Sequence, residues 1–198
     1  MSPRPYQAGE RRKAATHATR SRIIEAAREL LADADVTSFS IDAVAQRADV
    51  ARMTVYYQFK SKPKLLEALF DDFAARANMR ELQKAFQETK VERAVFRIVD
   101  VFCNLWKTQG ALVRRLSAMA ALDPEVEGAL RERQSWRRDL LAKIVAREHR
   151  GKAAAEIVEL LYVLTSFETY DMLAAWRTPK GALAFLHRAA AMVLKAGR

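Results

Sequence analysis

Apolar residues in the first third of the chain recur at intervals of three and four, which is the period of one face of an α-helix. Over residues 17–34 they form a single narrow stripe, which predicts an amphipathic helix with one buried face. Ser40 then precedes a shorter apolar series that ends at Ala48, as an N-cap precedes a short helix. A third short helix is predicted over residues 52–59, in which only Val55 and Phe59 are spaced for burial.

The remainder of the chain predicts longer helices that carry more apolar residues. Ser61 caps the first of them, with Pro63 in its first turn. Gly151 is predicted to end the helix that starts at Asp123 and Pro124. With 6 glycines and 5 prolines in 198 residues, and no alternating strand pattern, the predicted fold class is all-α. The further helices are expected over residues 91–107, 111–122, 124–149, 153–176 and 179–195.

The change from short to long helices divides the chain into three parts. Residues 1–16 are predicted to form a flexible basic arm, since residues 1–22 contain six Arg and Lys side chains against one Glu. Residues 17–62 form an N-terminal unit of three helices. Residues 63–198 form a larger helical domain, and no glycine- or serine-rich linker separates it from the N-terminal unit.

The net charge narrows the class of partner. A formal charge of +10 and a pI of about 10.0 favour a polyanion, of which nucleic acid is the commonest. The longest apolar runs are far shorter than the ~18 residues that indicate a membrane span, and the first residues lack the apolar segment of a secretory signal. We therefore expect a soluble cytoplasmic protein without a membrane partner.

The patterns that indicate an enzyme are missing from the sequence. His17, His149 and His187 do not share the spacing of a metal site or of a nucleophile and its base. There is no glycine-rich phosphate loop and no G-x-S-x-G motif. A single cysteine, Cys103, excludes an internal disulfide and a cysteine-rich zinc site. We expect no enzymatic activity, no metal and no cofactor.

Two short helices joined by a tight turn, with a third helix packed across them, predict a helix-turn-helix unit. At about 100° per residue, Val55 and Phe59 lie ~40° apart and form the inward edge of the third helix. Its other side chains then face outward, and a major groove of DNA is wide enough to admit such a helix. Tyrosine and threonine hydroxyls suit phosphates and base edges, and Met53 suits thymine methyls. A solvated surface helix is the alternative interpretation.

The segment from Arg22 to Phe70 is specific enough to compare with a known family. Its features are "AA" before "LL" in the first helix, "SIDAVAQRADV" in the second helix and turn, and "TVYYQF" followed by lysines and "LL". With these motifs, the segment resembles the DNA-binding domain of the TetR family of bacterial transcriptional regulators. The similarity covers about 50 of the 198 residues.

The resemblance implies a set of DNA contacts. Lys62 would anchor a phosphate at the start of the fourth helix, and Ser40 would act as both helix cap and phosphate ligand. Val55 and Phe59 would belong to the core. The recognition-helix contacts would be Arg52, Met53, Thr54, Tyr56, Tyr57 and Gln58.

Three positions depart from the usual pattern of the family. Asp49 stands where the turn commonly has glycine, and Ala51 replaces a serine or threonine cap, which forfeits ~1 kcal/mol. Met53 replaces a small residue. None of these changes removes the fold, but together they mean that the operator cannot be assigned by analogy.

The C-terminal domain suggests two further partners. The resemblance implies a homodimer that forms through the last two helices, and two symmetry-related recognition helices would read a pseudopalindrome. It also implies a cavity for a small apolar or amphipathic effector; the alternative for each candidate is the ordinary core. Glu168 and Asp171 suit a cationic or hydroxyl-bearing ligand, or face solvent. The cavity candidates are Phe102, Trp106, Met119, Tyr162, Phe167, Glu168, Tyr170 and Trp176.

These features predict a sequence-specific DNA-binding regulator that acts as a ligand-responsive, homodimeric repressor. An activator or a ligand-independent regulator is the alternative. A DNA-binding protein driven by charge alone is a further alternative, but it would not need so large an apolar C-terminal domain. The basic segment 131–150 is interpreted as a solvated helix face rather than a second DNA surface.

Overall fold

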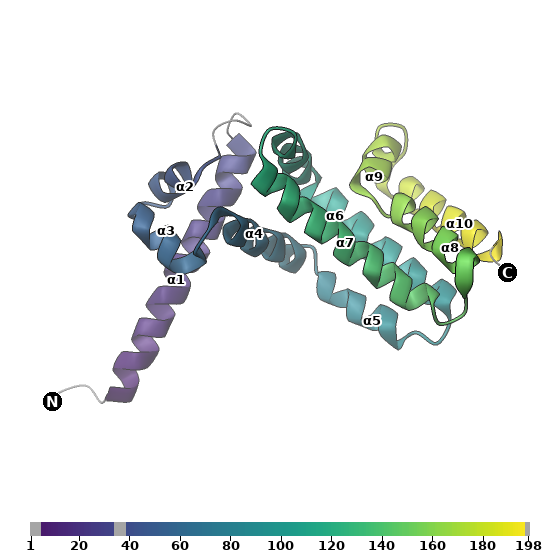
Figure 1. The fold of residues 1–198 in the computed structure, drawn as a ribbon, viewed down its shortest axis with the longest axis horizontal. Helices are drawn as coiled ribbons and strands as arrows, with labels where there is room; N and C mark the ends of the chain where they lie inside the picture. Colours follow the sequence, from purple (N-terminus) through teal and green to yellow (C-terminus); the bar gives the residue numbers. More distant parts are fainter. Residues whose placement is uncertain (1–4, 34–38, 197–198) are drawn as a thin grey trace.

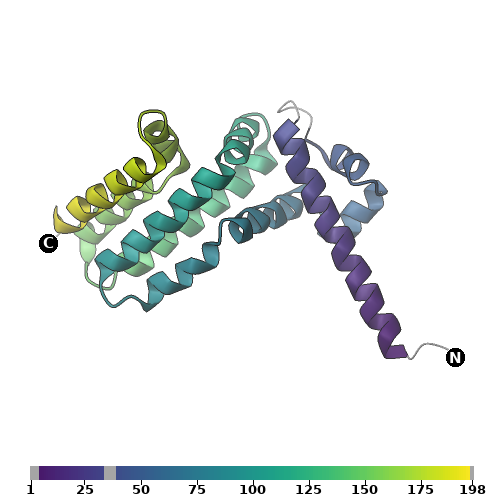
Figure 2. The same cartoon turned by 180° about the vertical axis from the view of Figure 1, so that it is seen from behind.

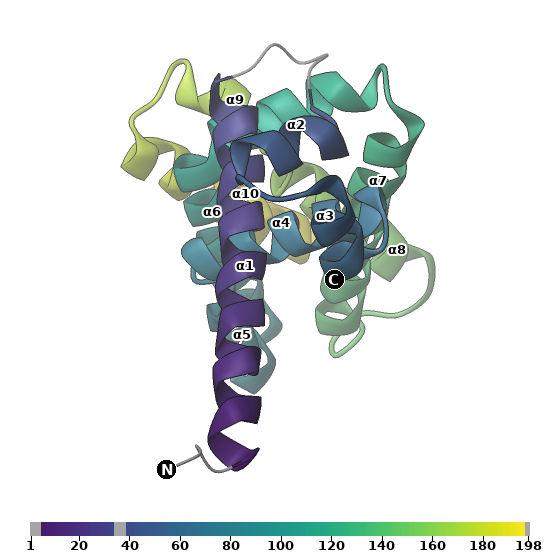
Figure 3. The same ribbon diagram turned by 90° about the vertical axis from the view of Figure 1, so that its left-hand side faces the viewer.

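Helix α1 (Pro5–Asp33) leads into a three-helix unit at one end of the molecule, and longer helices build the other end (Figure 1). This computed structural model describes residues 5–33 and 39–196. Every regular element within those ranges is a helix, so the all-α prediction is confirmed. The first turns of α1 project away from the rest of the molecule, as the view along the long axis makes plain (Figure 3).

The prediction for the start of α1 is wrong. The helix begins at Pro5 rather than near His17, so residues 5–16 are helical where the sequence predicted a flexible arm. Proline is tolerated in a first turn, and the Ala, Gln, Glu, Arg and Lys side chains that follow are strong helix formers. The predicted buried stripe is present from Ile23 to Leu31. Residues 1–4 and most of the predicted loop before Phe39 lie outside the described residues.

The helix-turn-helix follows the sequence prediction closely. Helix α2 (Ile41–Arg47) is capped by Ser40, whose Oγ accepts a hydrogen bond from the Ala43 N–H at 3.1 Å. Asp49 has a φ of 50° in the turn, the left-handed geometry that its glycine-like position requires. Helix α3 (Arg52–Phe59) starts without a side-chain cap at Ala51. Helix α4 (Lys62–Arg76) is capped by Ser61.

Two elements after α4 were not predicted: the 3₁₀ turn η2 (Met79–Glu81) and helix α5 (Leu82–Gln87). Helix α6 (Val91–Ala120) replaces two predicted helices, because Gly110 lies inside it rather than at an end. A Cβ atom at Gly110 would lie 3.2 Å from Cε2 of Phe167. The glycine therefore permits a close contact between helices and does not break α6.

Helix α7 (Pro124–Val145) begins at the predicted Asp123 cap but ends earlier than predicted. Gly151, with a φ of 62°, opens helix α8 (Gly151–Leu164) instead of ending α7. Helix α10 (Pro179–Ala196) follows its prediction.

The predicted helix 153–176 is divided into α8 and α9 (Phe167–Ala174). The Thr165 carbonyl accepts hydrogen bonds from Trp106 Nε1 at 3.0 Å and from Arg137 Nη1 at 2.7 Å. Those bonds take this carbonyl out of the helical pattern, and Ser166 then caps α9 through its bond from the Thr169 N–H.

The long helices form a layer in which α6 and α7 lie side by side, with α8 and α10 packed beside them (Figures 1 and 2). Helix α4 packs on both α1 and α7, so it joins the helix-turn-helix to the larger domain. One continuous apolar core extends through both parts. Within the described ranges, no helix has the length and apolarity that a membrane crossing needs.

Candidate functional site

Helix α3 is attached to the protein by one thin edge. Val55 and Phe59 are fully buried, as the sequence predicted. Met53 and Tyr57 are 72% and 69% exposed, although both carry large apolar surfaces. A helix that buries so little of itself and exposes such side chains is shaped to enter a groove of a partner.

Helix α1 fixes the inner edge of α3. Arg20 Nη1 donates a hydrogen bond to the Gln58 carbonyl at 3.0 Å, and its guanidinium lies 4.3 Å from the centre of the Phe59 ring. Sequence reasoning assigned Arg20 to the basic N-terminal segment and missed this role. Its half-buried side chain positions α3.

Arg52 connects α3 to α2. Its Nη1 lies 3.0 Å from Oδ2 of Asp42, and its Nη2 donates to the Tyr56 hydroxyl at 3.4 Å. The Tyr56 hydrogen bond, followed by the charge of Asp42, raises the pKa of this exposed guanidinium. Tyr56 itself is half-buried against the core. Arg52 therefore orients Tyr56 and lies at the exposed start of α3.

The other predicted DNA contacts divide into exposed and half-buried groups. Ser40 is exposed at the start of α2 and uses its hydroxyl as the cap. Thr54 and Gln58 are half-buried along the sides of α3. The structure thus gathers six of the eight predicted residues on one helix, with Ser40 at the neighbouring helix start.

Lys62 differs from the expected free phosphate anchor. It is half-buried and donates a hydrogen bond to the carboxylate of Asp123, the cap of α7. This bond, aided by the Glu125 and Val126 N–H groups, holds the pKa of Asp123 below its ordinary value. In this structure Lys62 therefore connects the two domains.

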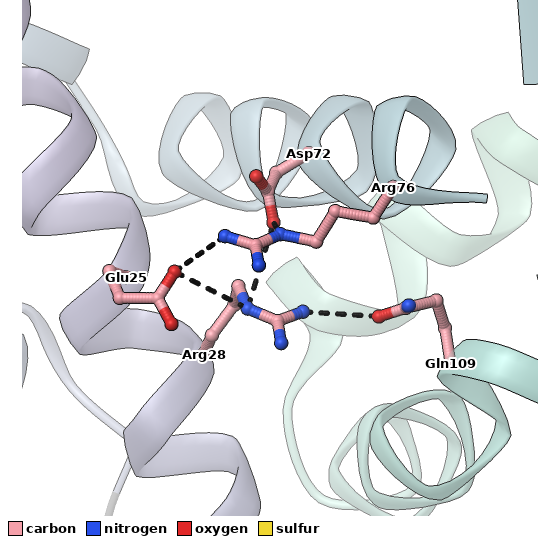
Figure 4. Close-up of polar contacts among 5 residues, drawn as sticks. All are labelled: Glu25, Arg28, Asp72, Arg76 and Gln109. Atoms are coloured by element: carbon pink, nitrogen blue, oxygen red, sulfur yellow. Dashed lines mark hydrogen bonds and ion pairs between the residues drawn. The ribbon is translucent and has the colours of Figure 1, made fainter. Parts of the chain in front are cut away.

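A second connection between the domains is a polar cluster of five residues (Figure 4). Arg76 of α4 donates to Glu25 of α1 at 2.6 Å and to Asp72 at 2.8 Å. Arg28 lies between these carboxylates, its Nε 3.6 and 3.7 Å from their oxygens, and its Nη1 donates to Gln109 of α6 at 3.1 Å. The cluster thus joins α1, α4 and α6.

A cavity of about 400 Å³ lies in the larger domain, between α4, α5, α6, α7 and α9. Four of the eight predicted residues line it: Phe102, Trp106, Phe167 and Glu168. The aromatic rings are in mutual contact, with the Trp106 ring 5.8 Å from both Phe102 and Phe167. The volume lies within the usual range of small-molecule sites.

The other four candidates lie away from the cavity lining. Met119 and Tyr170 are buried in the core, and Tyr162 packs behind the cavity wall with its ring 4.3 Å from the Arg137 guanidinium. Trp176 lies in the turn after α9 and is 89% exposed. These four predictions of cavity-lining residues are therefore not supported by their positions.

Sequence reasoning missed several lining residues, above all Arg137. It is only 6% exposed, although it lies in a basic segment interpreted as a solvated face. One signal was available: Arg137 lies seven residues after Leu130 and seven before Ile144, on the apolar stripe of α7. The other missed residues come largely from the neighbouring helices and include Phe70, Phe73, Phe86, Arg133 and Trp136.

Apart from Leu122, the exposed large apolar residues gather in three places on the described surface. Met53 and Tyr57 lie on α3, and Phe86 and Trp136 line the cavity. A third set lies on or directly after the last three helices, and it consists of Leu160, Val163, Met172, Trp176 and Met192.

The parts of the chain that the structure describes contain no group of three or more His, Cys, Asp or Glu side chains placed to hold a metal ion.

Comparisons with known proteins agree with this architecture. Residues 23–69 match the model of a family described as bacterial regulatory proteins, tetR family. The HTH-type transcriptional regulator EthR of Mycolicibacterium smegmatis is 29% identical over 171 residues, which span 83% of this chain and 72% of that protein.

Two solved structures share the fold over most of both chains. Native NalD, the secondary repressor of the MexAB-OprM multidrug efflux pump in Pseudomonas aeruginosa, has a TM-score of 0.70 at 18% identity, covering 90% of this chain and 96% of NalD. FadR from Bacillus subtilis, solved with stearoyl-CoA, has a TM-score of 0.60 at 16% identity, covering 88% and 97%.

A helix-turn-helix with an exposed third helix, joined to a larger helical domain, defines a DNA-binding transcriptional regulator, a class without enzymatic activity. Within that class, the family model and the likeness to EthR support a TetR-family regulator. Residues 23–69 match the TetR family of bacterial regulatory proteins, and the chain as a whole shares the fold of NalD and FadR.

Proposed function

We propose that this regulator is a homodimeric repressor that reads a pseudopalindromic operator through α3 and releases it when a small molecule enters the cavity. The observation that carries the DNA-binding part is the contrast within α3. Two residues are fully buried, whereas Met53 and Tyr57 are 72% and 69% exposed. The chain has a net charge of +10, and together with these exposed side chains it supports binding to the major groove of DNA.

The apolar residues exposed on α8–α10 support the homodimer. Val163 and Met192 are 57% and 70% exposed, on helices α8 and α10, which pack against each other. Apolar side chains gathered in this way indicate an interface between proteins. A second copy of the chain fits, because one short helix reads few bases and two related helices read an inverted repeat.

The route from the cavity to the DNA runs through α4. Phe70 and Phe73 of α4 line the cavity. Arg133 of α7 also lines it and donates to the Glu67 carbonyl at 3.3 Å and to the Asp71 carboxylate. A ligand that displaces these side chains would shift α4, which is bound to α1 through the polar cluster of Figure 4. Such a shift changes the position of α3 relative to DNA.

The repressor and effector parts draw support from the relatives. NalD is described as a repressor and FadR was solved with a bound acyl-CoA, so the shared fold accommodates both properties. A reporter gene placed behind the operator distinguishes repressor from activator: deletion of the regulator raises expression in the first case and lowers it in the second.

Selection of bound duplexes from a random DNA library, followed by sedimentation of the complex, tests the proposal. We expect enrichment of two inverted half-sites and a complex that contains an even number of chains. Failure to enrich any sequence would favour binding by charge alone and contradict the proposal.

A further inference from the structure

Arg137 is a buried cation without an acidic partner. It is 6% exposed, lies in the cavity wall, donates a hydrogen bond to the Thr165 carbonyl at 2.7 Å, and interacts with the Tyr162 hydroxyl. Its guanidinium also lies 4.3 Å from the Tyr162 ring centre and 5.7 Å from that of Phe102. Among the described residues, no carboxylate oxygen lies within 4.0 Å of it. A guanidinium keeps its charge, and the Thr165 carbonyl and the Tyr162 hydroxyl are neutral, so the positive charge of Arg137 has no negative charge beside it.

The acidic residues near the cavity do not supply the missing charge. Asp71 is paired with Arg133, and Asp171 is paired with Arg114. Glu168 lines the cavity but is exposed, and it acts on Arg137 only through a longer-range attraction that opposes the effect of burial on the pKa of Arg137. Arg80 and Arg133 add positive charge to the lining. The lining therefore contains three arginines and one glutamate, and Arg137 is the most buried of the four.

Apart from Arg137, the buried part of the lining is apolar. Phe73, Phe102, Leu105, Leu140 and Phe167 are buried there, and they offer no groups that bind a polar chain. At about 30 Å³ per heavy atom, similar to the share of a water molecule in the liquid, 400 Å³ holds on the order of a dozen atoms. This is the size of a medium-length hydrocarbon chain with a small head group.

We propose that the cavity binds an amphipathic carboxylate, with its carboxylate on the Arg137 guanidinium and its hydrocarbon chain among the buried aromatic and aliphatic side chains. The inference rests on the proposed function only for the existence of an effector site. A carboxylate matches the planar guanidinium with two parallel hydrogen bonds, and it provides the counter-charge that the protein lacks. This proposal excludes the cationic ligand that Glu168 and Asp171 suggested.

Three probes with the same chain test the head group: decanoate, 1-decanol and decyltrimethylammonium. Fluorescence titration of the full chain reports their binding, because Trp106 and Trp136 both line the cavity. We expect decanoate to bind at least about tenfold more tightly than decanol. The reason is that a charge-assisted hydrogen bond from the buried Arg137 guanidinium to the carboxylate adds to the binding free energy. The cation should bind more weakly than both.

A matched pair of variants assigns this difference to one residue. Arg137→Met should reduce decanoate affinity to that of decanol, whereas Arg138→Met should leave it unchanged, since Arg138 is exposed beside Glu159. If Arg137→Met fails to fold, the three probes on the unmodified protein still decide the question. Equal binding of decanoate and decanol, tighter binding of the cation, or no binding of any probe would each overturn the inference.

Different results would contradict the proposed regulatory function and the proposed carboxylate ligand. Selective DNA binding that a neutral or cationic molecule reverses would preserve the regulator and remove the carboxylate. Tight decanoate binding without selective DNA binding would do the opposite.

Discussion

The ammonium of Lys62, in the first turn of α4, donates a hydrogen bond to the carboxylate of Asp123, the cap of α7. Both side chains are half-buried. The end of the DNA-binding unit is thereby joined to the start of the helix that carries Arg133 and Arg137. A shift of α4 relative to α7 has to stretch or break this pair, which makes it a sensitive point in the path that we propose between the cavity and α3.

A double-mutant cycle on Lys62→Gln and Asp123→Asn tests this connection. We expect the two changes to be non-additive in the free energy of unfolding, with a coupling of about 0.5–1 kcal/mol. Lys64→Gln is the control, because Lys64 is exposed and its ammonium donates to Glu67 within the same helix. It should show no coupling to Asp123→Asn. If Lys62 and Asp123 act additively, the pair does not connect the domains.

The same pair predicts a pH dependence. The Lys62 hydrogen bond lowers the pKa of Asp123 in the folded state below the ordinary value of ~3.9. The carboxylate therefore stabilises the protein fully above about pH 4, and this contribution is lost as the pH falls through the folded-state pKa. Denaturant unfolding of the protein and of Asp123→Asn should give a constant difference from pH 8 to 5 that shrinks below about pH 4. A difference that changes between pH 8 and 5 would contradict this origin.

The same substitution, glycine to alanine, should have different effects at two glycines within helices. No atom lies within 4 Å of a Cβ built on Gly128, so Gly128→Ala should raise the free energy of unfolding by about 0.5–1 kcal/mol. Gly110→Ala should raise the free energy of unfolding by less, because the new Cβ atom would press on the Phe167 ring. That ring borders the cavity and would move into it, so ligand affinity should fall. Denaturant unfolding and the fluorescence titration measure both effects; equal behaviour of the two variants would count against the contact.

The dimer is tested by placing charge on the apolar face of α8–α10. Val163→Glu combined with Met192→Glu should shift the protein to monomer in sedimentation, because a buried, unpaired charge opposes association. Leu122→Glu is the control: Leu122 is 72% exposed but lies in the turn after α6. Dimerisation unaffected by the double change would place the interface elsewhere.

Local signals in the sequence were sufficient for the helix-turn-helix. Ser40 and Ser61 cap the predicted helices, and the spacing of Val55 and Phe59 identified the inner edge of α3. Each of these features is decided by neighbours within a few residues. The early start of α1 was missed because the charge of residues 5–16 was given more weight than their helix propensity.

The cavity and the division of α8 from α9 depend on contacts between distant residues. The Thr165 carbonyl is bound by Trp106, 59 residues away, and by Arg137, 28 residues away. Periodicity along one helix contains no information about those partners. For the same reason, four aromatic and sulfur-containing candidates were assigned to a cavity from which the fold excludes them, and Arg137 was taken for a surface residue.

The outward side chains of α3 should decide DNA affinity without affecting the fold. Tyr57→Ala should weaken operator binding by about tenfold or more, since Tyr57 is 69% exposed and its ring is free to enter a groove of DNA under our proposal. Helicity and sedimentation should stay unchanged. Tyr57→Phe separates the ring from the hydroxyl, and Tyr56→Ala should also weaken binding. Normal operator affinity in both alanine variants would show that α3 is not the recognition helix.

The most direct test of the central claim is the ratio of affinities for DNA upstream of the protein's own gene and for scrambled DNA of the same composition. Mobility-shift titrations at several salt concentrations give this ratio together with the number of phosphates contacted. We predict a ratio of about 10³ or more that persists as salt weakens both affinities. A ratio near one at every salt concentration would mean that charge alone drives binding, and it would contradict the account.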